Sequence, residues 1–353
     1  MERIRVGLVG VTGYTGMELA RLLVDHEGFE LVRATSRAEA GKRLGELYPF
    51  LQGLPLAELV VSQPEPKDLA EACDLVFLAV PHGAAMDMAA ALRATGLKVV
   101  DLSADFRLRD LAVYAEWYGL VHRQERLMHE AVYGLPELYA EQIVTAQLVA
   151  NPGCYPTAAI LGLYPALKHG LVEPVGLVVD AKSGASGAGR KASLPLLFGE
   201  VTENFRAYNL GKHRHTPEIE QELSVVAGQN LHVSFNTHLV PMSRGILATS
   251  YGMLTHKMSQ ATLAEVHGIY RVTYATHPWV RVLPEGSLPE TRFVRGTMYC
   301  DVGVVVDPRT KRLIVVTAID NLCRGASGQA LANANLMSGL PLEMGLPKVA
   351  LMP

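Results

Sequence analysis

The first half of the chain alternates two kinds of segment, and this alternation constrains the fold more than any other feature. Short apolar segments rich in β-branched residues recur, as expected for strands that are buried on both faces. They span residues 4–9, 31–35, 75–80, 99–102 and 148–150. Helical patterns lie between several of them, at 16–26 and 83–94. Strand, helix and strand in succession are typical of a Rossmann-type, doubly wound parallel sheet.

The pattern changes after residue 150. Longer strand-like runs with few helices among them occupy residues 177–181, 232–240, 245–254, 298–306 and 313–319. Such runs predict a second, α+β domain with a mostly antiparallel sheet. We therefore expect an α/β chain of two domains, with residues 1–150 binding a dinucleotide and residues 151–320 binding the substrate. The segment 325–340 has a helical pattern.

Composition argues against several classes of protein. Lys and Arg total 32 against 35 Asp and Glu, a net charge of −3, which predicts no basic surface for nucleic acid or an anionic membrane. The four cysteines are widely separated, without the spacing of a disulfide scaffold or a zinc site. The first apolar segment is too short for a signal sequence, and no apolar run approaches the roughly 20 residues of a membrane helix. We expect a cytoplasmic protein.

A glycine-rich turn joins the first apolar segment to the first helical pattern. Its glycines are separated by two residues each, a departure from the commoner G-x-G-x-x-G spacing of dinucleotide-binding turns. Glycines let the backbone approach a pyrophosphate, which the N–H groups and dipole of the helix start attract. The candidate cofactor contacts are Gly10, Thr12, Gly13, Tyr14, Thr15 and Gly16. A tight turn without a ligand is the alternative.

The end of the second apolar segment favours NADP over NAD. An NAD-binding unit usually places Asp or Glu there for the ribose hydroxyls, whereas the 2′-phosphate of NADP needs cations and hydroxyls. Here Ser36 and Arg37 follow the segment, and the first carboxylate is Glu39. We predict that Ser36 and Arg37 bind NADP (NADPH). The alternative is that Arg37 is a solvated surface residue.

Cys154 is the candidate nucleophile. Pro152 and Gly153 predict a turn between an apolar strand and a helical pattern, so Cys154 should lie at or just before a helix N-terminus. A helix N-terminus lowers the pKa of a thiol, and its N–H groups can stabilise an oxyanion. The alternative is a small buried apolar residue, which is what we expect of Cys73, Cys300 and Cys323.

Two histidines are candidate bases. His213 and His215 lie just before a helical pattern that Thr216 can cap, with Pro217 at its first position. Either imidazole can accept the thiol proton and later return one. A metal site and a solvated loop are the alternatives. Because no third ligand lies at a recognisable spacing, we expect no metal.

Two further segments follow predicted strands. Residues 182–191 combine glycines with cations, which suits an anion or amide contact, although a mobile loop is equally compatible. In residues 101–107, Arg107 can hold a carboxylate or phosphate, or can pair with Asp105 at the surface.

Together these motifs resemble the N-acetyl-γ-glutamyl-phosphate reductases, the arginine-biosynthesis family of the semialdehyde dehydrogenase superfamily. The resemblance runs over nearly the whole length. The motifs that carry it lie at residues 13–16, 102–107, 151–157, 186–190, 213–218 and 320–322.

The resemblance implies NADPH-dependent reductive dephosphorylation of N-acetyl-γ-glutamyl phosphate to N-acetylglutamate 5-semialdehyde. Cys154 would form a thioacyl intermediate, and His213 would act as acid and base. Further implied or expected contacts are Ser186, Gly187 and Asn321 near the nicotinamide, and Arg107 and His215 at the substrate.

The resemblance also implies that a C-terminal helix, within about residues 321–353, completes the first domain. It further implies that the sheet of the second domain forms a homodimer or homotetramer contact. Three alternatives remain: a reductase of carrier-protein-bound aminoadipyl phosphate in lysine synthesis, a non-catalytic nucleotide-sensing protein, and a cysteine hydrolase.

Overall fold

The chain, described here from a computed structural model at residues 2–352, divides into two compact units. The first comprises the residues up to Pro152 together with Ala326–Leu346, and the second comprises Gly153–Gly325 together with the residues from Pro347 on. The resemblance implied that a C-terminal helix, within about residues 321–353, completes the first domain. The residues after Leu346 instead count with the second unit, where Met298 N–H donates to Pro347 O and Arg295 Nε donates to Leu351 O, each at 3.1 Å.

The first unit contains a six-stranded sheet with the order β2-β1-β3-β4-β6-β5, and every pair in it is parallel. Its strands are β1 (Ile4–Val9), β2 (Phe29–Thr35), β3 (Leu75–Leu78), β4 (Lys98–Asp101), β5 (Val132–Tyr133) and β6 (Leu148–Ala150). The order reverses at β1, because β2 and β3 lie on its two sides. A ligand of such a sheet binds outside the carboxyl ends of the strands at this reversal.

The first unit also contains α-helices. They are α1 (Tyr14–Leu23), α2 (Leu44–Leu47), α3 (Pro66–Ala72), α4 (Ala85–Ala94), α5 (Leu111–Tyr118), α6 (Glu125–Glu130), α7 (Pro136–Thr145) and α12 (Gly328–Met337). The helix α12 comes from the distant end of the sequence, and buried amides attach it to this unit. Asn333 Nδ2 donates to Gly134 O at 2.9 Å and lies 3.1 Å from Asn151 Oδ1.

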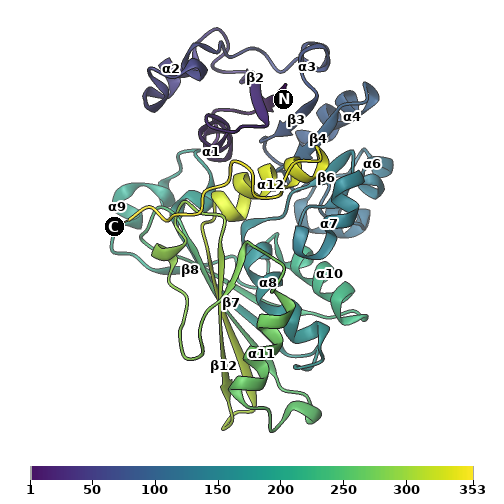
Figure 1. The fold of residues 1–353 in the computed structure, drawn as a ribbon, viewed down its shortest axis with the longest axis vertical. Helices are drawn as coiled ribbons and strands as arrows, with labels where there is room; N and C mark the ends of the chain where they lie inside the picture. The colour runs from purple at the N-terminus through teal and green to yellow at the C-terminus, as the bar shows by residue number, and fades with distance from the viewer. Residues whose placement is uncertain (1, 353) are drawn as a thin grey trace. The chain divides into compact units, whose positions relative to one another are not determined.

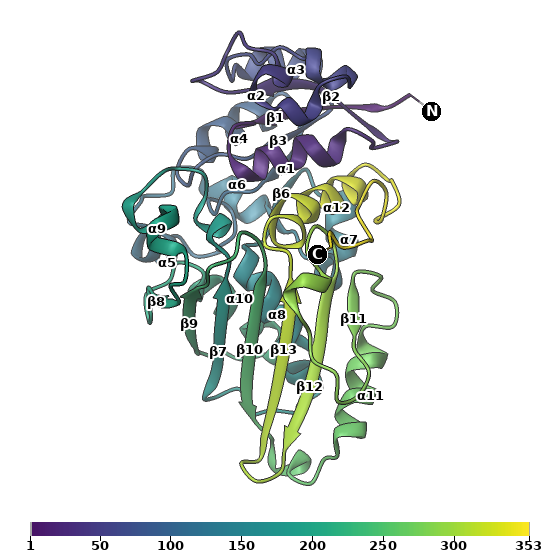
Figure 2. The ribbon, with the colours of Figure 1, turned by 90° about the vertical axis from the view of Figure 1, so that its left-hand side faces the viewer.

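The second unit is built on a seven-stranded mixed sheet with the order β11-β12-β13-β10-β7-β9-β8. Its strands are β7 (Leu177–Ser183), β8 (Arg206–Tyr208), β9 (Val233–Leu239), β10 (Ile246–Met253), β11 (Val280–Val282), β12 (Cys300–Asp307) and β13 (Arg312–Ile319). Helices α8 (Cys154–Lys168), α10 (Thr216–Ala227) and α11 (Leu263–Thr273) lie on one face of this sheet (Figures 1 and 2). The short α9 (Phe198–Val201) precedes β8.

The two sheets confirm the predicted fold class, a parallel doubly wound sheet followed by a mostly antiparallel one. In the second sheet only the β7–β9 and β11–β12 pairs are parallel. The sequence analysis missed β5, β8 and β11. Each is two or three residues long, which is too short to show an alternating pattern.

His26 joins the end of α1 to the C-terminal part of the first unit. Its Nε2 lies 3.1 Å from Asn335 Oδ1, and its Nδ1 accepts the N–H groups of Gly28 and Phe29 at 3.1 and 2.9 Å. A Cβ at Gly345 would lie 2.1 Å from the ring, so only glycine fits there. Burial lowers the pKa of His26 below its ordinary value.

This buried imidazole predicts a pH dependence of stability. Below about pH 6.5 the unfolded chain takes up a proton on His26 that the folded chain resists, so the free energy of unfolding should fall as the pH falls. His26→Asn, which keeps an acceptor near the position of Nδ1, should flatten this dependence. Urea unfolding of both proteins at several pH values between 5 and 8 measures it. Equal slopes of stability against pH in the two proteins would contradict the expectation.

Candidate active site

Cys154 occupies the first position of α8, as predicted. The helix cap is Gly153, which provides no side-chain cap, so the helix start presents its backbone N–H groups. Cys154 is half-buried, whereas Cys73, Cys300 and Cys323 are buried, and none of the four is in a disulfide. The most accessible thiol is thus the one at a helix N-terminus, where a thiolate is stabilised.

The turn before Cys154 is held through both backbone groups of Gly153. The Gly153 N–H donates to Glu218 Oε1 at 2.8 Å, and the Gly153 carbonyl accepts the N–H and the hydroxyl of Thr157 at 3.0 and 2.9 Å. Pro156 has no N–H. An oxyanion at this helix start would therefore be held by the N–H groups of Cys154 and Tyr155.

The histidine loop leads directly into α10. His215 occupies the cap of this helix and Thr216 its first position, so the prediction that Thr216 is the cap was wrong by one residue. The His215 carbonyl already accepts the Ile219 N–H at 3.1 Å, and Pro217 lies in the first turn, where its missing N–H costs nothing.

His213 lies among aromatic rings. The centroid of its ring is 5.4 Å from that of Tyr155, 5.8 Å from Tyr208 and 5.3 Å from Phe235. Burial in this group, with a smaller contribution from Arg214, lowers the pKa of His213 to about 4. The imidazole is therefore neutral near pH 7. Through Tyr155, the residue next to Cys154, the structure brings the two predicted catalytic segments into contact.

The proton position on His213 follows from one hydrogen bond. The His215 N–H donates to His213 Nδ1 at 3.1 Å, so the neutral ring carries its proton on Nε2. His213 and His215 lie side by side, with ring centroids 4.9 Å apart. The contact of His215 with substrate remains a prediction.

Ser186 and Asn321, which are 135 residues apart in sequence, are brought into direct contact. Asn321 Nδ2 donates to Ser186 Oγ at 3.0 Å, while Asn321 Oδ1 accepts the Gly245 N–H at 2.7 Å. Gly187 lies in the same short helical turn, Ala185–Ala188, and a Cβ there would lie 3.0 Å from Ser183 Oγ. Their contact with the nicotinamide remains a prediction.

The three glycines of the first turn differ in whether a larger residue could replace them. A Cβ at Gly10, whose φ is +91°, would lie 2.3 Å from Ala79 O, and a Cβ at Gly16 would lie 2.3 Å from Gly10 O. At Gly13 the nearest atom would be 3.8 Å away. Packing therefore requires Gly10 and Gly16, while Gly13 leaves open space at the uncapped start of α1, where a pyrophosphate fits.

The end of β2 carries no unpaired carboxylate. The Ser36 hydroxyl lies 3.5 Å from Thr12 Oγ1, which joins the β2 end to the glycine turn, and Arg37 is exposed. The Glu39 carboxylate is 2.6 Å from Lys42 Nζ. This set of groups fits an additional phosphate on the ribose better than free ribose hydroxyls.

Arg107 is buried, so the interpretation of a surface pair with Asp105 was wrong. Its Nε donates to Asn151 O at 2.7 Å and another N–H group donates to Leu102 O at 3.0 Å, with 6% of the residue exposed. These bonds join the ends of β4 and β6. A substrate contact by Arg107 remains a prediction.

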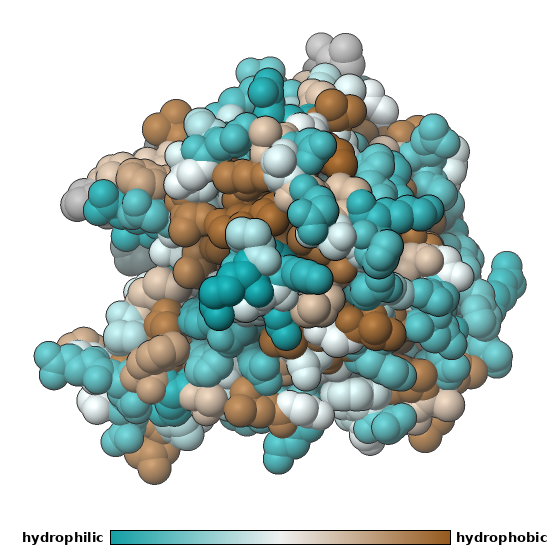
Figure 3. Space-filling model, turned by 90° about the horizontal axis from the view of Figure 1, so that it is seen from below, coloured by the Kyte–Doolittle hydropathy of each residue, from teal (hydrophilic) through white to brown (hydrophobic). Residues whose placement is uncertain are grey.

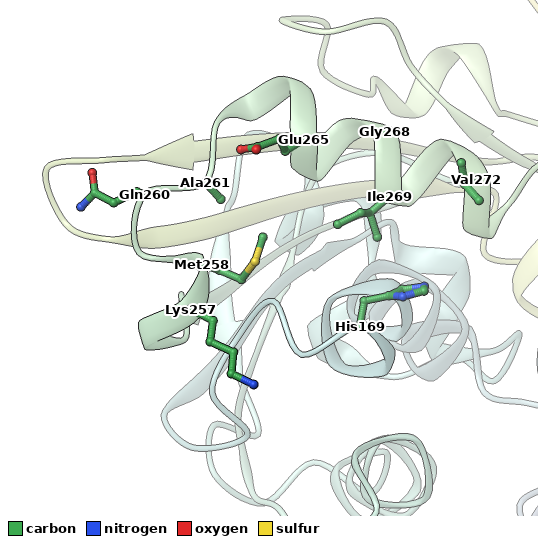
Figure 4. A pocket seen from close by; sticks show the side chains of 9 residues that line it. All are labelled: His169, Lys257, Met258, Gln260, Ala261, Glu265, Gly268, Ile269 and Val272. Atoms are coloured by element: carbon green, nitrogen blue, oxygen red, sulfur yellow. The ribbon is translucent and has the colours of Figure 1, made fainter.

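A cavity of about 660 Å³ lies elsewhere in the second unit. Its lining includes His169, Lys257 and Ile269, contributed by the end of α8, the turn before α11 and α11 itself (Figure 4). His169 caps the end of α8 opposite to Cys154, and α8 has 15 residues, so the two lie roughly 20 Å apart along the helix. The cavity is not the site of the cysteine chemistry.

Within residues 2–352, no group of three or more His, Cys, Asp and Glu side chains is arranged to hold a metal ion. Among the same residues, no helix combines the length and the apolar character needed to cross a membrane.

Comparison with known proteins decides the family. Residues 5–146 match the sequence model of the NAD binding domain of semialdehyde dehydrogenases, and residues 154–321 match that of their dimerisation domain. N-acetyl-γ-glutamyl-phosphate reductase of Symbiobacterium thermophilum is 52% identical over 97% of both chains. That of Geobacter sulfurreducens is 50% identical over 99% of this chain and 100% of its own. The chain belongs to the N-acetyl-γ-glutamyl-phosphate reductase family.

Solved structures share the fold of this reductase family at low sequence identity. Aspartate semialdehyde dehydrogenase with NADP from Candida albicans has a TM-score of 0.72 at 18% identity, covering 96% of this chain and 99% of its own. Aspartate semialdehyde dehydrogenase II complexed with ASA from Vibrio cholerae has a TM-score of 0.71 at 14% identity, with the same coverage. These likenesses show the fold alone.

Sequence reasoning missed two residues of the site. Tyr208 lies in the unexpected strand β8, and its hydroxyl is 2.7 Å from that of Tyr155. Glu218 lies in the histidine motif that carried the resemblance, but it was assigned no role. Its position in the first turn of a helix did not reveal this role, because the burial of its carboxyl group is visible only in the structure.

The glycine turn predicts two separable effects. Gly16→Ala should destabilise the chain by at least about 2 kcal/mol, because the new Cβ meets backbone atoms. Gly13→Ala should change stability by no more than about 1 kcal/mol yet weaken NADP binding about tenfold, because the methyl group fills space that the pyrophosphate needs. Urea unfolding and calorimetric titration with NADP measure the two effects. A Gly13→Ala protein that binds NADP as tightly as its parent would contradict the assignment.

Proposed function

We propose that the chain reduces N-acetyl-γ-glutamyl phosphate to N-acetylglutamate 5-semialdehyde with NADPH and releases phosphate, a step of arginine biosynthesis. The observation that carries the proposal is the helix start at Cys154, clamped at Gly153 and placed beside the neutral imidazole of His213 through Tyr155. Relatives about 50% identical over nearly the full length bear the name of this reductase.

The first half of the reaction forms a thioester. The Cys154 thiolate attacks the γ-carbonyl carbon of the acyl phosphate, and the carbonyl oxygen becomes an oxyanion held by N–H groups at the start of α8. Collapse of this adduct breaks the carbon–oxygen bond to phosphate, which leaves with the bonding electrons. The acyl group is then bound to sulfur, and no redox change has occurred.

The second half reduces the thioester. NADPH, when bound, supplies the hydride that the thioester carbon accepts. The resulting oxyanion collapses to the aldehyde, and the Cys154 sulfur leaves as thiolate. The N–H groups at the helix start hold the oxygen in both halves, so one donor set serves two adducts of the same geometry.

His213 supplies an N–H group beside this sulfur. Because Nδ1 accepts the His215 N–H, the ring proton is on Nε2, and the neutral ring can donate this N–H in a hydrogen bond to the oxyanion or to the departing thiolate. The surrounding rings of Tyr155, Tyr208 and Phe235 exclude water and disfavour the imidazolium. In this tautomer His213 is thus a hydrogen-bond donor, and it can act as a base only when Nδ1 releases the His215 N–H.

The cofactor is NADP. Gly13 leaves space for the pyrophosphate at the start of α1, and Ser36 with Arg37 provides a hydroxyl and a cation for the 2′-phosphate. The Gly187 turn, with the bonded pair Ser186 and Asn321, serves the nicotinamide end.

Association into a homodimer or homotetramer belongs to the same proposal. Val178, Tyr251 and Ile314 form a row across the sheet face opposite to α8, and each is half-buried in the single chain. Leu194 and Phe198 are 70% and 84% exposed. Figure 3, viewed from the end of the second unit where β12 and β13 meet, shows hydrophobic surface beside a hydrophilic tip.

Sedimentation velocity tests association, and a single-chain mass at micromolar concentration would refute it.

The four cysteines form no disulfide, which is compatible with a reducing compartment. Location in the cytoplasm remains a prediction, which fractionation of cells would test.

The reverse reaction tests the function directly. With N-acetylglutamate semialdehyde, phosphate and NADP, we expect NADPH to form in proportion to enzyme, to depend on phosphate, and to form far faster than NADH from NAD. Cys154→Ser should lower kcat by about a thousandfold or more, because the nucleophile is lost.

Cys73→Ser is the matched control. Burial raises the pKa of this thiol to about 11, and the same atom exchange there should leave kcat within about threefold. Turnover that persists in Cys154→Ser, or that proceeds equally without phosphate, would refute the covalent route.

A further inference from the structure

Glu218 lies fully buried in the first turn of α10, and it binds a different helix. Its Oε1 accepts the N–H of Gly153, the cap of α8, at 2.8 Å. Glu265 occupies the equivalent position of α11, where its carboxylate binds the cap residue Thr262 of its own helix. The Glu265 carboxylate secures the start of its own helix, and the Glu218 carboxylate joins the start of α10 to the start of α8.

The two helix starts joined by Glu218 carry the two catalytic groups. On one side, Gly153 is followed directly by Cys154. On the other, the Thr216 N–H donates to His213 O at 2.9 Å, so the histidine loop is bonded to the same turn of α10 that carries Glu218. The spacing between nucleophile and imidazole is therefore set through one side chain as well as through the ring contact of Tyr155 with His213.

Catalysis is sensitive to such spacing. A displacement of about 1 Å of a reacting group can lower a rate by about a hundredfold, even when its cause lies away from the reacting atoms. Glu218 can prevent such a displacement of Cys154. Its side chain is 0% exposed, and its helix, α10, has 12 residues and packs along α8.

We propose that Glu218 is a positioning residue, whose Oε1, by holding the Gly153 N–H, fixes Cys154 at the helix start relative to His213. The proposal rests on the proposed function for its kinetic test, but its chemical test needs only the thiol of Cys154.

Two substitutions separate the reach of the side chain from its charge. Glu218→Gln keeps an oxygen acceptor at the same distance from the backbone and removes the acid. Glu218→Asp keeps the acid and withdraws the acceptor by one methylene. If position is what matters, Glu218→Gln should retain kcat within about fivefold, while Glu218→Asp should lose about a hundredfold in kcat with KM for NADP and semialdehyde within about threefold.

Glu220→Asp is the matched control. Glu220 lies on the same helix, and its Oε1 also accepts a backbone N–H, that of Val233 at 2.9 Å, at the start of β9. The same shortening there should leave kcat within about threefold. Thermal unfolding of all variants checks that they fold.

Alkylation by iodoacetamide measures the reactivity of the Cys154 thiol without substrate or cofactor. Peptide mass mapping should place the label on Cys154, since the other three cysteines are buried. In Glu218→Asp the midpoint of the alkylation rate against pH should rise by about half a unit or more, because the sulfur moves away from the N–H groups that stabilise its thiolate. Glu218→Gln should show no such rise. A role limited to global stability would leave the midpoint unchanged in both.

The outcomes are decisive in either direction. Glu218→Gln clearly more active than Glu218→Asp, with the midpoint raised only in Glu218→Asp, supports the proposal. Equal activity of the two, a better Glu218→Asp, or an equal loss in Glu220→Asp overturns it. If Glu218→Asp does not fold, a loss of about a hundredfold in Glu218→Gln overturns it and near-parent activity supports it. If the parent shows no turnover, the proposed function fails while the alkylation profiles still decide the role of Glu218.

Discussion

The start of α8 is the constraint on which the catalytic unit depends. Gly153 is held through both its N–H and its carbonyl, so the residue after it has little freedom. The helix that follows is fixed to the sheet and to α11: Thr317 Oγ1 donates to Ala158 O at 3.1 Å, and the Tyr270 hydroxyl donates to Gly162 O at 2.8 Å. The seven-stranded sheet therefore serves as the rigid support of one sulfur atom.

The chemistry of the histidine follows from its surroundings rather than from its identity. Aromatic neighbours remove water from His213, and the loss of hydration disfavours the charged ring. A backbone N–H then fixes which nitrogen carries the proton. In the loop that carries His213 and His215, the tautomer of the His213 ring is therefore set by a backbone group of its neighbour.

The sequence predicted those features that depend on local rules. The strand and helix alternation, the glycine turn before α1 and the helix start at Cys154 each follow from residue types that lie close together in the chain. Contacts between residues that are far apart in the chain could not be predicted from the sequence. The bond of Gly153 to Glu218 spans 65 residues, and that of Arg107 to Asn151 spans 44. The spacing of residues in the sequence does not indicate which backbone group a buried carboxyl group or guanidinium will bind.

The path of the chain has a consequence for biosynthesis. The first unit includes α12, which supplies Asn333 and Gln329 to the carbonyl of Gly134, and the whole second sheet is translated before α12 appears. The first unit, although its N-terminal part leaves the ribosome first, is thus the last to complete its fold. Until α12 is translated, the apolar surface of the first unit that α12 covers remains exposed. All strands of the second sheet, in contrast, have been translated by then.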